Sequence, residues 1–132
     1  MRFGTSCSSW MLGGFMLILL ARAESSAGEC AKAETQREIE ACLQDALAKA
    51  SKEVDDAYNR YLVSLPKEQR SLLKRAQDAW VHYRDANCKA SAAVYSGGTM
   101  APAELAGCKL DHTRDRLAEL RRIYEEPPSP KR

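Results

Sequence analysis

The sequence lacks a surplus of charge of either sign. It carries 20 basic and 18 acidic residues in 132, and two of the basic residues, Arg2 and Arg22, lie within the first 23 residues. The rest of the chain is therefore formally neutral. A nucleic-acid-binding domain normally gathers an excess of lysine and arginine on one face. The composition therefore argues against a nucleic-acid partner.

The sequence also lacks an apolar run of membrane-spanning length. The run Trp10–Leu20 is about half of the roughly 20 residues that a spanning helix needs. Arg2 precedes it, and the small-residue pattern Ala21-Arg22-Ala23 follows it, as in a cleaved secretory signal. We therefore expect a signal peptide at residues 1–23, with cleavage before Glu24. The product is expected to be soluble, periplasmic or secreted, and without a membrane anchor.

Cysteine is present, but not in the spacing of a metal or haem motif. Loss of Cys7 with the signal leaves an even number of cysteines, which in an exported domain predicts two disulfides: Cys30, Cys42, Cys88 and Cys108. A zinc site formed with His82 and His112 is the alternative. No C-x-x-C or H-x-x-x-H spacing supports it, and an oxidising compartment competes for the thiols. No C-x-x-C-H motif for haem attachment occurs. We expect no metal and no cofactor.

Three stretches with helical periodicity follow the signal, each with apolar residues three and four positions apart. The first begins at Thr35, with Glu38 placed to complete a capping box. Pro66 ends it, Gly97-Gly98 end the second stretch, and Pro102 begins the third. Short connections require neighbouring helices to run antiparallel. The prediction is an all-α, antiparallel three-helix bundle over residues 24–125, stapled by two disulfides, with a disordered proline-rich tail at residues 126–132.

The two turns are expected to bring all four cysteines to one end of the bundle. Cys42 and Cys88 are equidistant from the first turn, near residue 65, and Cys88 and Cys108 from the second, near residue 98. Cys30 precedes the first helix by a short segment. Cys30–Cys42 with Cys88–Cys108 is therefore one solution, and Cys42–Cys88 with Cys30–Cys108 is the other. We favour the first, although the spacing leaves both open.

The second stretch holds the richest polar segment of the chain. Gln77, Trp80 and Arg84 lie three or four residues apart and therefore nearly share a helix face. An arginine beside a helix seam needs a carboxylate, because an unpaired buried charge is costly. Asp55 or Asp56 is expected to pair with Arg84, and Arg116 with Asp85. We interpret the set as a structural polar clamp, with ligand contact by Arg84 or Trp80 as the alternative.

Neither histidine stands in a recognisable catalytic arrangement. A histidine acts as a general base when a nucleophile or a substrate proton lies within reach. His82 has no evident nucleophile beside it, and its neighbours Val81 and Tyr83 are typical packing residues. His112 is equally isolated in the sequence. We therefore expect no enzyme activity and no catalytic residues.

The order of these residues resembles a known family. The matching pattern is Cys30, Thr35-Gln36, Cys42, Asp56-Ala57-Tyr58-Asn59, Gln77-x-x-Trp80-x-x-Tyr83-Arg84-Asp85-x-x-Cys88, Gly97-Gly98-Thr99-Met100, Cys108 and Thr113-x-x-Arg116. Over about residues 30–122 the chain is similar to the lysozyme inhibitor LprI-like N-terminal domain, a family of small exported bacterial proteins. The resemblance implies a helical exported domain that inhibits a lysozyme. Membrane tethering does not carry over, because the chain has no evident lipidation cysteine.

Two functional hypotheses follow. The first is a non-catalytic binding protein of the cell envelope, with a lysozyme or another envelope protein as its partner. Lysozymes are basic and use two carboxylates in a cleft, so an acidic surface beside a protruding loop would suit an inhibitor. The acidic residues expected near one end are Glu29, Glu34, Glu38, Glu40 and Asp45, and the loop residues expected to contact a partner are Tyr95, Ser96, Gly97, Gly98 and Thr99. The second hypothesis is a structural or interaction module of the envelope with no lysozyme target.

Overall fold

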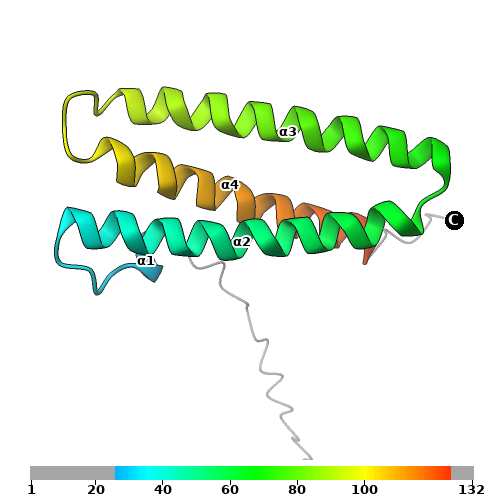
Figure 1. Ribbon diagram of the computed structural model, residues 1–132, viewed down its shortest axis with the longest axis horizontal. Helices are drawn as coiled ribbons and strands as arrows, with labels where there is room; N and C mark the ends of the chain where they lie inside the picture. The colour runs from blue at the N-terminus through cyan, green and yellow to red at the C-terminus, as the bar shows by residue number, and fades with distance from the viewer. Residues whose placement is uncertain (1–25, 126–132) are drawn as a thin grey trace, which may run out of the picture.

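The computed structural model describes residues 26–125, and this part of the chain is helical without a strand (Figure 1). A short helix, α1 (Ser26–Glu29), precedes three long ones: α2 (Gln36–Ser64), α3 (Lys67–Ala93) and α4 (Ala101–Tyr124). The all-α prediction is confirmed. None of these helices is both long enough and apolar enough to cross a bilayer. The predicted signal peptide, residues 1–23, and the predicted tail, residues 126–132, lie outside the described residues, so the domain limits remain predictions.

A capping box opens α2, as the sequence predicts. The Thr35 hydroxyl accepts a hydrogen bond from the Glu38 amide at 3.2 Å, and the Glu38 carboxylate accepts one from the Thr35 amide at 3.0 Å. The Glu34 amide donates a further hydrogen bond to the Glu38 carboxylate at 2.9 Å. The backbone hydrogen bonds from Glu34 and Thr35 lower the pKa of Glu38, since they favour the charged carboxylate. Two donors that would otherwise be unsatisfied at the helix start are thereby paired.

The turn between α2 and α3 is set by Pro66. Leu65 has extended backbone angles, φ −87° and ψ 149°, which end α2 directly before the proline. Arg70, in the first turn of α3, reaches back to the end of α2. Its guanidinium donates to the carbonyl of Leu65 at 2.6 Å and to that of Val63 at 3.3 Å. The last carbonyls of α2 therefore have a cationic partner, which also favours the helix dipole.

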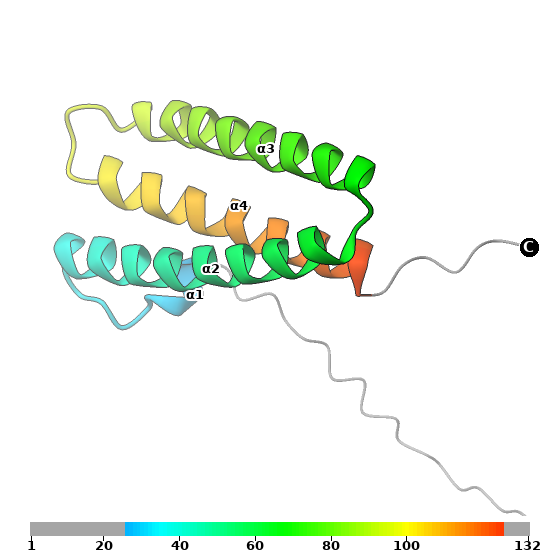
Figure 2. The same ribbon diagram turned by 45° about the vertical axis from the view of Figure 1, so that its right-hand side comes forward.

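The three long helices are antiparallel neighbours along the chain, and α4 lies between α2 and α3 (Figures 1 and 2). The packing is dominated by the α2–α4 and α3–α4 interfaces, whereas α2 and α3 contact each other little. The predicted three-helix bundle is confirmed, with α4 as its central member. Side chains of α4 therefore face two different neighbours, and these two interfaces differ in chemistry.

The buried apolar residues form two clusters along the α2–α4 interface. One lies at the end of the bundle where α2 and α4 begin, and its buried members are Cys30, Leu43, Ala46, Ala50, Ala103, Ala106 and Leu110. The other lies towards the Pro66 turn, and its buried members are Val54, Ala57, Tyr61, Leu73, Leu117 and Leu120. Leu73 is the one member that α3 contributes to these two clusters. The apolar core of the described chain is therefore mainly a product of α2 and α4.

Two disulfides are formed, with the pairing that the sequence analysis favours. Cys30 bonds to Cys42, with 6.0 Å between their Cα atoms, and Cys88 bonds to Cys108, with 5.6 Å between theirs. The first holds the segment after α1 against α2, and the second holds α3 against α4. Cys30 and Cys108 line the same groove, so both bonds lie at one end of the bundle. We call this the disulfide end.

Candidate functional site

A loop at the disulfide end, residues 94–100, joins α3 to α4. Successive turn hydrogen bonds order its backbone: the Ser96 amide donates to Ala93 at 3.1 Å, and the Gly98 amide donates to Tyr95 at 3.0 Å. Gly97 has φ +82°, in the left-handed region that favours glycine. The Cys88–Cys108 bond crosslinks the two helices just below the loop. The loop is therefore short and ordered, and a disulfide joins the two helices from which it extends.

The side chains of this loop are exposed apolar groups for the most part. Val94 is 81% exposed, Tyr95 44% and Met100 43%. Such residues gathered on one loop are typical of a surface that binds another molecule, where aromatic and methionine side chains are enriched. The predicted contact residues Tyr95, Ser96, Gly97, Gly98 and Thr99 all lie in this loop. Their role in contacting a partner remains a prediction.

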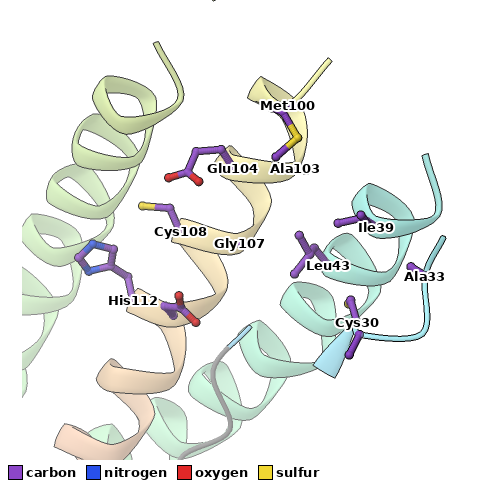
Figure 3. A pocket seen from close by; sticks show the side chains of 12 residues that line it. Cys30, Ala33, Ile39, Leu43, Met100, Ala103, Glu104, Gly107, Cys108 and His112 are labelled. Carbon is purple, nitrogen blue, oxygen red and sulfur yellow. The ribbon is translucent and has the colours of Figure 1, made fainter. Parts of the chain in front are cut away.

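A groove of about 610 Å³ opens beside the loop (Figure 3). Its walls are apolar, with Cys30, Ile39 and Leu43 on one side and Met100, Ala103 and Gly107 on the other, and Glu104, Asp111 and His112 add polar groups. Met100 belongs to both the loop and the groove. The loop and the groove therefore form one continuous surface of the disulfide end.

The acidic residues that the sequence places near this end have mixed roles. Glu29 forms an ion pair with Arg114, midway along α4. Glu38 is held in the capping box, and Glu40 accepts a hydrogen bond from Gln44 at 2.9 Å. Three of the five carboxylates thus have partners within the protein. Among these three, Glu29 is paired with a cation, whereas Glu38 and Glu40 accept hydrogen bonds from uncharged donors. The acidic approach surface remains a prediction.

The polar segment of α3 lies at the α3–α4 interface, with partners that differ from those expected. Arg84 pairs with its neighbour Asp85, at 3.0 Å, and lies 3.4 Å from the Thr113 hydroxyl. Asp85 also pairs with Lys109 of α4 at 3.2 Å. The expected partner Asp56 instead pairs with Lys52 on its own helix. Burial raises the pKa of Asp85, but hydrogen bonds from Arg84 and Lys109 outweigh this effect and lower it below its ordinary value.

Arg116 supplies the second part of this contact. Its side chain is 7% exposed, and it donates to Gln77 at 3.1 Å and to Glu119 at 2.7 Å, rather than to Asp85 as expected. The ring of Trp80 lies near both guanidinium groups, 4.8 Å from that of Arg84 and 5.9 Å from that of Arg116. Each buried charge is therefore paired, as its desolvation requires. These contacts join α3 to α4 and are consistent with the predicted clamp, whose role as such remains a proposal.

A smaller cavity of about 200 Å³ adjoins Trp80 between α2 and α3. Asp55, Gln77, Arg84 and Thr113 line it. Asp55 therefore faces the same space as Arg84, as the sequence analysis expects, although the ion pair of Arg84 is made with Asp85.

Sequence reasoning missed the surroundings of His112. One imidazole nitrogen and the sulfur atoms of Cys88 and Cys108 all lie within 4.8 Å of one another. The amide of Asn87 is 3.0 Å from His112 Nε2, and the Tyr83 ring meets the imidazole edge-on at 5.7 Å. The signal was available, because Cys108 and His112 stand four residues apart on one helix face. The spacing Cys108-x-x-x-His112 is neither H-x-x-x-H nor C-x-x-C, the two spacings against which the zinc alternative is judged from the sequence.

The model of one protein family matches residues 27–120, almost the whole described chain. That family is described as lysozyme inhibitor LprI. The chain belongs to the LprI family. An uncharacterised protein of Rhizobium meliloti (strain 1021) is 29% identical to this LprI family member over 118 residues, which cover 80% of this chain and 85% of the relative. No solved structure gives a significant match. The family resemblance found in the sequence is thus confirmed.

Proposed function

We propose that this protein is a non-catalytic, exported binding protein of the cell envelope that inhibits a lysozyme through its disulfide end. The observation that carries the proposal is the family match over residues 27–120. The two disulfides support export, because such bonds persist in oxidising compartments and are rare in the cytosol. A periplasmic or secreted location follows from the same chemistry and from the signal-like first 23 residues.

The loop at residues 94–100 has the properties that an inhibitory contact needs. A lysozyme cleft presents two carboxylates and a groove shaped for a sugar chain. Tyr95 offers a broad amphipathic side chain with a hydroxyl donor, the type of residue that dominates binding hot spots. The Cys88–Cys108 bond and the turn hydrogen bonds order the loop before binding. Little conformational entropy then remains to be lost when a partner docks.

Inhibition is tested with the oxidised protein, beginning at Glu24, in an assay that follows lysis of a peptidoglycan suspension by lysozymes of several structural types. The expected result is slower lysis by at least one of them. Val94→Ser combined with Tyr95→Ser should weaken inhibition at least about tenfold, since hot-spot losses commonly exceed 1.4 kcal/mol.

The matched control is Val63→Ser, because Val63 is 72% exposed at the opposite end of the bundle and Val94 is 81% exposed in the loop. This variant should inhibit as well as the unmodified protein. Circular dichroism establishes that both variants keep their helices. No inhibition by the oxidised protein at any concentration, with any lysozyme, would remove the proposal.

A second function is supported by one observation. Glu29, one of the acidic residues near the disulfide end, is paired with Arg114 within the protein rather than free to meet a basic target. This favours an envelope interaction module with no lysozyme target. The two functions predict that the immobilised protein will capture different envelope proteins. An immobilised oxidised protein should retain lysozyme from a defined mixture under the first, and only non-lysozyme envelope proteins under the second. The loop variant should lose lysozyme retention and leave the second kind of binding unchanged.

A further inference from the structure

The α3–α4 interface beneath the loop holds three side chains that can bind a metal ion. Cys88, Cys108 and His112 each offer one metal-binding atom, and these three atoms lie within 4.8 Å of one another. We propose that reduction of the Cys88–Cys108 disulfide converts this cluster into a zinc site, with two thiolates and one imidazole as protein ligands. In the oxidised protein both sulfur atoms are consumed by the disulfide. The site is therefore conditional on the redox state.

The required movement is small. Zinc binds thiolate sulfur at about 2.3 Å and imidazole nitrogen at about 2.0–2.1 Å, so tetrahedral ligand atoms lie about 3.5–3.8 Å apart. The nitrogen and the sulfur atoms are already within 4.8 Å. The two sulfur atoms, now joined by a covalent bond, would have to separate to that spacing once the bond is reduced. Rotation of the two cysteine side chains supplies this change without moving a helix.

The scaffold holds the ligands independently of the disulfide. Cys108 and His112 are one turn apart on α4 and point to the same side of that helix (Figure 3). Polar contacts on both sides keep α3 beside α4: Ser91 donates to Glu104 at 2.5 Å, and Asp85 pairs with Lys109 at 3.2 Å. These contacts should keep α3 and α4 in register after the disulfide is reduced.

The ring of His112 is also oriented. The Asn87 amide lies 3.0 Å from its Nε2, and the edge-on contact with Tyr83 restricts its rotation. Metal-binding histidines usually have such a hydrogen-bond partner on the other ring nitrogen, which fixes the tautomer and the ring plane. An amide can turn to accept from that nitrogen as readily as it donates to it. Asn87 is therefore placed to support the ligand.

The chemistry of the ligand set favours zinc. Two thiolates and one imidazole are a common zinc combination, and three protein ligands leave a fourth position for water. Cys88 is buried, whereas Cys108 and His112 are partly exposed, so a metal ion can enter from solvent. An external dithiol reduces the protein disulfide to two thiols and is itself oxidised to a disulfide. Binding of Zn²⁺ then releases the two thiol protons to water.

Cobalt is the spectroscopic probe for this site. The protein beginning at Glu24 is reduced with a phosphine, which takes up the oxygen of water and leaves two thiols, and is titrated with Co²⁺. One bound ion with a thiolate-to-cobalt charge-transfer band is expected, and Zn²⁺ should displace it. The oxidised protein should show no such band. The variant Cys30→Ser with Cys42→Ser should behave like the unmodified protein, since those two sulfur atoms lie outside the cluster.

His112→Ala and His82→Ala are the matched pair, because they are the two histidines of the chain. Loss of an outer partner of a metal ligand commonly costs about 10- to 100-fold in affinity, so His112→Ala should weaken Co²⁺ binding at least about 100-fold. His82→Ala should leave it unchanged. Equal affinities for the two variants would overturn the proposal, as would a band that survives Cys88→Ser with Cys108→Ser. If reduction unfolds the chain, Zn²⁺ must restore the helical circular dichroism, because binding then drives folding; failure to do so also overturns it.

Discussion

The two faces of α4 are built in different ways. Towards α2 it buries leucine and alanine side chains in two apolar clusters that run along most of the helix. Towards α3 it makes a disulfide, a lysine–aspartate ion pair and three side-chain hydrogen bonds, which are Ser91–Glu104, Arg84–Thr113 and Arg116–Gln77. Apolar burial is spread over a whole interface, whereas these polar and covalent contacts act at particular residues. The α2–α4 pair is therefore the core of the protein, and α3 is attached to it at discrete points.

This difference explains where the candidate sites lie. The cavity beside Trp80 and the cysteine–histidine cluster are formed partly by α3, the loop follows directly after α3, and the groove beside the loop is lined by α4, α2 and the segment before α2. An apolar interface excludes water and reactive groups, while an interface made of cysteine, histidine and charged residues can bind or exchange them. The polar α3 face thus holds the cysteine–histidine cluster, whereas the α2 face supplies most of the apolar core and one wall of the groove.

The largest effect is expected from Leu110→Ala, at the α2 face. Leu110 is fully buried within the apolar cluster at the disulfide end. Removing a leucine from such a site costs about 2–5 kcal/mol, since transfer free energy is lost and a cavity remains. The free energy of unfolding, measured by urea denaturation of the oxidised protein, should fall by about 3–4 kcal/mol. Leu120→Ala, equally buried in the other cluster, should behave alike.

The comparison of the two faces would fail if either leucine variant lost less than about 1 kcal/mol. Leu72→Ala is the matched control, because Leu72 on α3 is 58% exposed. Its stability should change by no more than about 0.5 kcal/mol, as for an ordinary surface substitution.

A somewhat smaller effect is expected at the α3 face from Cys88→Ser with Cys108→Ser. The bond closes a loop with a sequence separation of 20 residues, and the chain-entropy model gives about 3 kcal/mol for a loop of that size. The loss of stability should also be concentrated in one part of the protein. Hydrogen exchange should quicken mainly in the half of α3 that contains Cys88, because polar contacts attach that half to α4, while Leu73 keeps the other half packed in an apolar cluster and α2 and α4 keep their protection.

Cys30→Ser with Cys42→Ser provides the contrast. That bond separates residues 12 apart and anchors the segment before α2, so the same model gives a similar loss of about 3 kcal/mol. In this double variant, hydrogen exchange should quicken around the start of α2, and α3 should remain protected. If both double variants quickened exchange in all helices equally, α3 would be as integral to the core as α2.

The fold was largely predictable because its determinants are local. Thr35 with Glu38, Pro66 and Gly97-Gly98 mark the ends of helices, and the three-and-four spacing of apolar residues marks their inner faces. These features placed the four cysteines at one end. The pairing stayed open because two arrangements of equal spacing satisfy the same topology, and only the three-dimensional position of the segment before α2 decides between them.

Side-chain partners at the α3 face were less predictable. Arg84 was expected to reach α2, yet it pairs with the adjacent Asp85, and Arg116 pairs with Glu119 one turn away. The expectation assumed that all three helices share one seam. The helices α2 and α3 contact each other little, and Arg84 pairs with Asp85 although Asp55 of α2 lines the same cavity. Which helix lies in the middle depends on the packing of the whole chain, and the periodicity within single helices does not predict it.

The smallest change in stability is expected on acidification, and it tests only the contacts between α3 and α4. The pKa of Asp85 is lowered in the folded protein: burial raises it, but the bonds from Arg84 and Lys109 outweigh that burial. A carboxylate with a lowered folded pKa contributes stability above its unfolded pKa of about 3.9, and this contribution is lost as pH falls through the folded value. The carboxylate is 37% exposed, so solvent screening keeps its contribution below about 1 kcal/mol.

Trp80 reports on this contact directly, since it lies against Arg84 and is the single tryptophan beyond Trp10 of the predicted signal. Acidification below pH 4 should change the Trp80 fluorescence of the oxidised protein before the helices melt, because protonated Asp85 releases Arg84 and Lys109. Asp85→Asn should remove this early step, whereas Asp56→Asn, whose ion pair with Lys52 lies within α2, should keep it. An early fluorescence step that persisted in Asp85→Asn would assign the change to another carboxylate, and the polar attachment of α3 would then depend on different residues from those identified at its interface with α4.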